Sequence, residues 1–156
     1  MKLVCPRCPG CNGTAFHVRA MRDEAVGLAT CANCEQSYLL LDSGDYWFDL
    51  IQQRYPREAR CPCKKSRGLA LELEYCFRED GDVESVRVWT VCAKCGKRTR
   101  RFTADIDYAD TAHLLDSPLI YCANPNVRYD LRQLTLFVTP QDIARVVQRE
   151  SSPCPS

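Results

Sequence analysis

The sequence predicts a mainly β fold with short helices. Two observations predict this fold class. Twelve cysteines in 156 residues fall largely into two similar blocks, each with a cysteine cluster at either end. Between the clusters, apolar and polar residues alternate with a period of two, which is typical of half-buried strands. Because a cytosolic chain keeps its thiols reduced, clustered cysteines indicate metal binding rather than disulfides.

The first block, residues 1–56, begins with three cysteines at equal spacing, Cys5, Cys8 and Cys11. Cys8 belongs to two overlapping CxxC pairs, and only one pair can form a given metal knuckle. The residue after the second cysteine of a knuckle often takes a left-handed conformation, which suits Asn12 but not Pro9. We therefore predict Cys8 and Cys11 as the ligand pair, with Cys5 as the alternative to Cys11. In the preferred arrangement Cys5 is a small buried thiol near the site.

The rest of the first block reads as three strands and a helix. Alternating apolar residues predict strands over 16–20 and 26–28, and residues 37–41 predict a third strand beyond the pair Cys31 and Cys34. Residues 45–54 predict a short helix with Phe48, Ile51 and Tyr55 on one face.

The second block, residues 57–120, carries Cys61, Cys63, Cys92 and Cys95 around a long predicted hairpin. Residues 69–77 alternate strictly, and Asp80-Gly81 favours a two-residue type I′ turn. This turn sets a register with Leu73 opposite Val88, Tyr75 opposite Val86 and Leu71 opposite Thr90. It also places Glu74 opposite Arg87, an opposite-charge pair, and Leu69 beside Cys92, so that the two cysteine clusters meet.

Shorter elements follow the hairpin. Residues 111–115 predict a helical turn that ends at Ser117-Pro118. An extension over 121–150 contains a predicted strand at 134–138 and a helix that starts at Thr139-Pro140. Residues 151–156 read as a disordered tail.

The two blocks resemble zinc ribbons over residues 5–42 and 61–104. The resemblance implies two ribbon modules packed together, each with a three-stranded antiparallel sheet and two knuckles that hold one structural zinc ion through four cysteine thiolates. The implied ligands are Cys8, Cys11, Cys31, Cys34, Cys61, Cys63, Cys92 and Cys95. Two departures weaken the pattern, because Cys61-Pro-Cys63 is CxC and Cys34 precedes Glu35 rather than glycine. Iron is the alternative metal, but the CxC pair argues against it. The remaining thiols, Cys76, Cys122 and Cys154, have no partner at ligand spacing, and the two histidines read as ordinary packed or exposed residues.

Charge is nearly balanced overall, at +1, but not locally. Eight basic residues lie in or beside the knuckles of the second block: Lys64, Lys65, Arg67, Lys94, Lys97, Arg98, Arg100 and Arg101. Acidic residues gather at the predicted hairpin tip instead. The basic residues predict a site for a nucleic-acid phosphate backbone, without sequence specificity. A solvated face that offsets the negative charge of a tetrathiolate site explains them equally well.

These features predict a non-enzymatic accessory protein that docks onto a larger, nucleic-acid-associated assembly. Tyr46, Trp47 and Phe48 are candidate contacts to a protein partner, with packing between the modules as the simpler role. A purely protein-binding adaptor is the alternative, and a thiol redox protein a weaker one. An all-thiolate site offers no open coordination position for hydrolysis, and we expect no small-molecule substrate. Without an apolar run of signal or membrane length, we expect a cytoplasmic protein.

Overall fold

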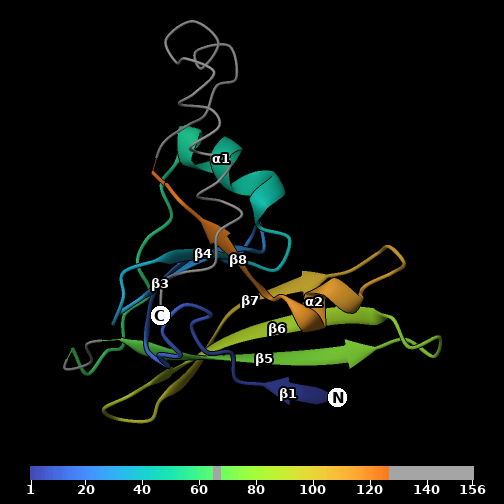
Figure 1. Cartoon of the computed structure of the whole chain (residues 1–156), viewed down its shortest axis with the longest axis horizontal. Helices are drawn as coiled ribbons and strands as arrows, with labels where there is room; N and C mark the ends of the chain where they lie inside the picture. The colour runs from blue at the N-terminus through green and yellow to red at the C-terminus, as the bar shows by residue number, and fades with distance from the viewer. Residues whose placement is uncertain (65–67, 127–156) are drawn as a thin grey trace, which may run out of the picture.

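The computed structural model describes residues 1–64 and 68–126 (Figure 1). The strand predicted at 134–138, the helix from Thr139 and the tail at 151–156 lie outside the described residues. Lys65, Arg67 and Cys154 lie outside them as well.

The strands of both cysteine blocks join in one antiparallel sheet of eight strands, in the order β7-β6-β5-β2-β3-β4-β8, with β1 paired to β5. The strands are β1 (Lys2–Val4), β2 (Phe16–Met21), β3 (Val26–Cys31), β4 (Ser37–Leu40), β5 (Leu69–Phe77), β6 (Val83–Cys92), β7 (Arg98–Asp105) and β8 (Leu119–Cys122). The three strands predicted in the first block are confirmed as β2, β3 and β4. β8 pairs with β4, so the predicted boundary between residues 120 and 121 falls inside a strand that joins the two blocks.

The predicted register of the β5–β6 hairpin is confirmed. Leu69 pairs with Cys92 and Glu74 with Arg87, and the intervening pairs follow in step. The side chains of Glu74 and Arg87 form the expected ion pair, with 3.0 Å between Oε1 and Nη1. Hydrophobic alternation and charge pairing therefore selected the same register that the fold adopts.

The turn of this hairpin differs from the prediction. A bulge between Cys76 and Phe77 shifts the pairing by one residue. Arg78 then donates its N–H to the carbonyl of Asp82 at 2.7 Å, which leaves a three-residue loop. Gly81 occupies the left-handed position of that loop at φ +93°. Three-residue hairpin loops need such a residue, so Asp80-Gly81 marked the turn correctly but not its length.

The two halves of the sheet fold over each other around one core. They meet where Phe16, the first residue of β2, pairs with Leu69, the first residue of β5. From that junction β2, β3 and β4 lie over β5, β6 and β7 (Figure 1). Phe16, Val18, Leu71 and Phe102 are fully buried between the layers. At the closest approach, Gly27 of β3 lies against the ring of Phe102 from β7.

Helix α1 (Gly44–Gln53) confirms the predicted helix and covers the opposite face of β3 and β4. Trp47 is fully buried and packs against Val26, Leu28 and Leu39, and its indole N–H donates to the carbonyl of Pro125 at 2.9 Å. Phe48 and Ile51, predicted to share one face with Tyr55, are partly buried beside Trp47, and the ring of Tyr55 meets Trp47 edge-on with 5.9 Å between centroids. The predicted helical turn is confirmed as α2 (Ala112–Asp116).

The half of the sheet formed by β2, β3 and β4 thus packs against β5–β7 on one face, and α1 covers β3 and β4 on the other. This explains why every residue of β4 is buried. Cys122 joins the cluster under α1 and is 7% exposed, in keeping with an ordinary core thiol. Among the described residues, neither helix has the length and apolar character needed to cross a bilayer.

Candidate metal centres and the basic surface

Four thiols of the first block converge on one point. The sulfurs of Cys8, Cys11, Cys31 and Cys34 all lie within 4.8 Å of one another. The shortest separations are 3.4 Å between the sulfurs of Cys11 and Cys31 and 3.6 Å between those of Cys8 and Cys34. Cys5 is exposed and belongs to no such group within residues 1–64 and 68–126. The structure therefore brings together the preferred set, and the expectation of a buried Cys5 is wrong.

Four thiols of the second block form an equivalent cluster. The sulfurs of Cys61, Cys63, Cys92 and Cys95 lie within the same 4.8 Å of one another. Cys61 and Cys95 are 3.3 Å apart at sulfur, and Cys63 and Cys92 are 3.6 Å apart. The CxC pair thus reaches the site as the CxxC pairs do.

The geometry of both clusters suits a metal ion. Tetrahedral coordination with metal–sulfur bonds of ~2.3 Å places neighbouring sulfurs ~3.8 Å apart. The observed separations of 3.3–3.6 Å lie near that value and far from a disulfide, whose sulfurs are ~2.05 Å apart. Two four-thiol groups therefore suggest two bound metal ions with a structural role.

The knuckle backbones explain how the sequence builds these sites. The residue after the second cysteine is left-handed in all four knuckles, with φ of 63° at Asn12, 63° at Glu35, 57° at Lys64 and 74° at Gly96. In each, its N–H donates to the carbonyl of the first cysteine at 2.8–3.0 Å. Glu35 stands where the zinc-ribbon pattern has glycine, and it nevertheless adopts the left-handed conformation that the knuckle requires. The CxC knuckle makes the same bond over a turn one residue shorter, from Lys64 to Cys61.

The sheet places both clusters at the junction of its two halves. Cys31 pairs with Phe16, Phe16 with Leu69, and Leu69 with Cys92. These four residues form one row across β3, β2, β5 and β6. Both clusters therefore flank the β2–β5 pair, at the point where the chain folds over itself.

Three neighbours of the first cluster were not predicted. The buried hydroxyl of Tyr38 lies 3.3 Å from the sulfur of Cys8. Burial opposes ionisation of Cys8, but this hydroxyl and backbone N–H groups outweigh burial and lower its pKa. A hydrogen bond from the Asn33 side chain, followed by the N–H of Gly13, lowers the pKa of Cys11 to about 6. Tyr38 stands in a continuous run of buried strand residues, so no sequence signal separates it from the core.

Close packing also constrains this site. A Cβ at Gly13 would lie 3.2 Å from the sulfur of Cys11 and 3.3 Å from that of Cys31. Burial raises the pKa of Cys34 to about 12. A bound cation favours the thiolate form of every ligand, so metal binding to this cluster releases protons.

The six described residues among the eight predicted phosphate contacts divide into two groups. Those that lie exposed around the second cluster, with no ion pair in the described part of the chain, are Lys64, Lys94, Lys97 and Arg100. We call these four residues the basic surface. Lys64, Lys94 and Lys97 lie in or directly beside the two knuckles, which meet at the Cys61–Cys95 and Cys63–Cys92 contacts, and Arg100 lies on β7.

Arg98 and Arg101 are already engaged within the protein. Arg98 pairs with Glu72 at 2.9 Å and with Glu74 at 3.4 Å, and its guanidinium lies 3.7 Å from the ring centroid of Trp89. Arg101 donates from Nε to the hydroxyl of Thr90 at 2.7 Å. Burial lowers the pKa of Arg101, and the nearby Cys61 opposes that change. Both arginines therefore serve the sheet as it stands, and each would have to leave its partners to bind phosphate.

Aromatic residues near the basic surface and on α1 differ in their exposure. Phe102 is core, with 1% exposure, and Trp89 lies under Arg98 on the outer face of β6. Trp47 is fully buried, so its prediction as a partner contact is corrected to a packing role. Phe48 is partly buried, whereas Tyr46 is 62% exposed.

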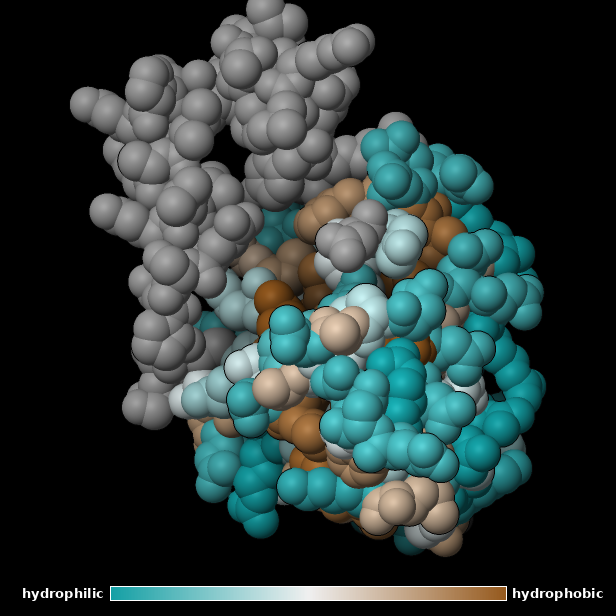
Figure 2. All heavy atoms as spheres, turned by 90° about the vertical axis from the view of Figure 1, so that its right-hand side faces the viewer, coloured by the Kyte–Doolittle hydropathy of each residue, from teal (hydrophilic) through white to brown (hydrophobic). Residues whose placement is uncertain are grey.

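The acidic end lies opposite the second cluster along the β5–β6 hairpin. Glu79, Asp80 and Glu84 are exposed at and beside the turn, and this end of the molecule is largely hydrophilic (Figure 2). Asp82 instead accepts hydrogen bonds from the N–H and hydroxyl of Thr111, which attaches the turn to the start of α2. The predicted separation of charge along the second block is therefore present.

Neither a family model, nor a curated protein, nor a solved structure matches this chain.

Proposed function

We propose that this chain is a non-enzymatic accessory protein in which two structural zinc ions hold the folded sheet and present the basic surface to a nucleic-acid backbone. The observation that carries the proposal is the pair of four-thiol clusters at the β2–β5 junction. Zinc suits all-thiolate tetrahedral sites, and a site closed by four protein ligands favours a structural over a catalytic role. Zinc is preferred to iron because one of the four knuckles is CxC.

The basic surface supports contact with phosphate. Lys64, Lys94, Lys97 and Arg100 are exposed, and no carboxylate of the described residues neutralises them. Such contacts are independent of sequence, because they reach phosphate rather than base edges. The exposed ring of Tyr46, on helix α1, is then available for a protein of the same assembly.

A protein-binding adaptor is the second candidate. It is favoured by the engagement of Arg98 and Arg101 within the sheet, which leaves fewer free cations than the sequence suggests. In that case the basic surface would contact acidic side chains of a protein partner.

The first test is metal content and chain stability. Purified protein should contain two zinc ions per chain by inductively coupled plasma mass spectrometry, and a strong chelator should abolish the cooperative unfolding transition. A chain that remains folded after complete removal of the metal would contradict the structural role.

The second test is a binding titration of zinc-loaded protein with single- and double-stranded DNA and RNA at several salt concentrations. Four phosphate contacts predict a slope of log K against log salt of about −3 for single strands. Neutralisation of Lys94, Lys97 and Arg100 to Gln should remove most of that slope. A matched triple variant at the exposed Lys2, Arg22 and Arg57 carries the same charge change and should bind normally. Absence of binding at low salt would favour the adaptor.

A further inference from the structure

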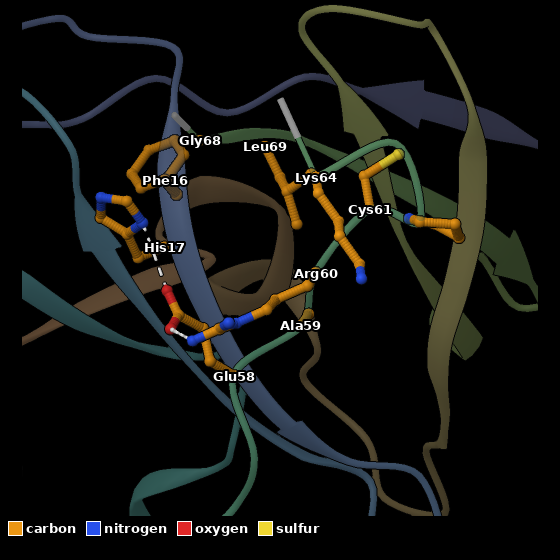
Figure 3. A pocket seen from close by; sticks show the side chains of 10 residues that line it. Phe16, His17, Glu58, Ala59, Arg60, Cys61, Lys64, Gly68 and Leu69 are labelled. Carbon is orange, nitrogen blue, oxygen red and sulfur yellow. Dashed lines mark ion pairs between the residues drawn. The ribbon is translucent and has the colours of Figure 1, made fainter. Parts of the chain in front are cut away.

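A cleft lies between β2 and the CxC knuckle of the second cluster (Figure 3). Its volume is about 580 Å³, within the range of about 300–1,000 Å³ that is usual for sites of small organic groups. The cleft is formed by both halves of the chain, because Phe16 belongs to the first block and Leu69 to the second. It is therefore held open by the same junction that carries the metal clusters.

The interior of the cleft is apolar. Phe16 and Leu69 lie at its base but are themselves buried, at 0% and 4% exposure, so the apolar side chains that line the cleft and reach solvent are Ala59 and Pro62. An apolar lining cannot satisfy a phosphate, but it suits the face of a planar ring.

The rim of the cleft is polar and fixed in position. The carboxylate of Glu58 lies 3.4 Å from Nδ1 of His17 and 3.6 Å from Nη2 of Arg60 (Figure 3). A β-bridge between Glu58 and Arg19, and a hydrogen bond from the N–H of Ala59 to β2, attach this segment to the sheet. His17 and Arg60 remain 49% and 83% exposed, so both planar groups are accessible from solvent.

The cleft is continuous with the basic surface. Lys64 lines the cleft and also belongs to the basic surface, and in Figure 3 its side chain lies between Leu69 and Cys61. A strand of nucleic acid on the basic surface would therefore pass the mouth of the cleft, with one nucleotide next to Lys64.

We propose that this cleft receives one unstacked base of a single-stranded nucleic acid, while Lys64 and the rest of the basic surface contact the flanking phosphates. The inference rests on the proposed function. Bases have apolar faces and polar edges, so a ring can stack on His17 or Arg60 and direct an amino group toward Glu58. A base held in a duplex cannot enter, so single strands are preferred. DNA and RNA share this chemistry, and the titrations include both.

The test compares three probes on the zinc-loaded full chain by fluorescence anisotropy: a labelled 12-nucleotide single strand, its duplex, and a 12-residue abasic strand with the same phosphates. The ordinary strand should bind about tenfold more tightly than the abasic strand, as expected for the loss of one stacked base. His17→Ala should weaken binding of the ordinary strand by about fivefold or more and leave the abasic strand unchanged. His17→Phe keeps a stacking ring and should retain most of the difference. His113→Ala, at the other histidine, should have no effect.

The outcomes separate the two proposals. Equal affinity for the ordinary and abasic strands, with salt-dependent binding of both, would overturn the cleft and leave the phosphate contacts standing. Equal effects of His17→Ala on both probes would also overturn it. No binding of any probe would overturn the cleft and the proposed function together. Photocrosslinking of a 5-iodouracil strand should label residues of the cleft, and labelling confined to other surfaces would refute the assignment.

Discussion

Gly27→Ala tests whether the two halves of the chain pack as one body. A Cβ at Gly27 would lie 2.8 Å from Cδ1 of Leu40 and 2.8 Å from Cε1 of Phe102, both in the core. Neither atom can stay in place, and overpacking of this kind costs about 1–3 kcal/mol. Replacement of glycine in a strand returns about 0.5–1 kcal/mol. The expected result is therefore a net loss of up to about 2.5 kcal/mol in the free energy of unfolding, with a central value of about 1 kcal/mol.

The assay is urea denaturation of zinc-loaded protein. The variants can be compared when the unfolding free energy of each falls with urea concentration at the same slope. Gly44→Ala is the matched control, because its nearest neighbour, Cδ1 of Leu39, lies at an ordinary 3.6 Å and the position begins α1. That control should be neutral or slightly stabilising. Phe102→Leu in the Gly27→Ala background should recover part of the loss. If Gly27→Ala were as stable as the control, β7 would not lie against β3, and the two-layer packing would be refuted.

Three further predictions concern the metal centre, the core and the sheet surface. Cys11→Ser should lower the zinc content by one ion per chain, and Cys5→Ser should leave two; the reverse result in a metal assay would exchange the roles of Cys5 and Cys11. Burial raises the pKa of Tyr75 to about 12, from an unfolded value of about 10. Its contribution to stability is thus complete below about pH 10 and is lost as the pH rises through about 12, and a denaturation series should show that Tyr75→Phe lacks this loss. Arg98→Gln should cost about 0.5–1 kcal/mol of stability with little effect on nucleic-acid affinity. Arg100→Gln should weaken nucleic-acid binding with little effect on stability. Equal effects of the two substitutions in both assays would contradict the assignment of Arg98 to the sheet and Arg100 to the basic surface.

The hairpin shows what the sequence alone could predict. A strict period of two over residues 69–77 and the pair Glu74–Arg87 each specify the register, and a shift of one residue would reverse every side chain. The fold adopts that register from Leu69 to Cys76. The length of the turn was not predicted, because a single bulge adds a residue to one strand only. No local sequence pattern around Phe77 indicates that bulge.

The metal ligands were predictable for a similar reason. Pro9 and Asn12 differ in the backbone conformations they allow, and this local difference identified the Cys8–Cys11 pair. Interactions across the fold were not accessible in this way. The contact between Tyr38 and Cys8, and the ion pairs that withdraw Arg98 from the basic surface, join residues more than 20 positions apart. A count of basic residues in sequence could not separate Arg98 from Arg100.

The position of the metal clusters explains why two small blocks form one protein. Each half of the sheet is short, and a small core alone is marginal in stability. The row from Cys31 through Phe16 and Leu69 to Cys92 is where the β2–β3–β4 half of the sheet joins the β5–β6–β7 half, through one residue pair. The pairings of β1 with β5 and of β8 with β4 link the two blocks elsewhere. A four-thiol cluster stands at each end of that row, so a metal on either side would fix the strand ends that make this one pair possible. Loss of either metal should then loosen the junction, the cleft beside it and the packing of both layers. Damage to one cluster is therefore expected to destabilise the other half of the chain, a coupling that independent modules would not show.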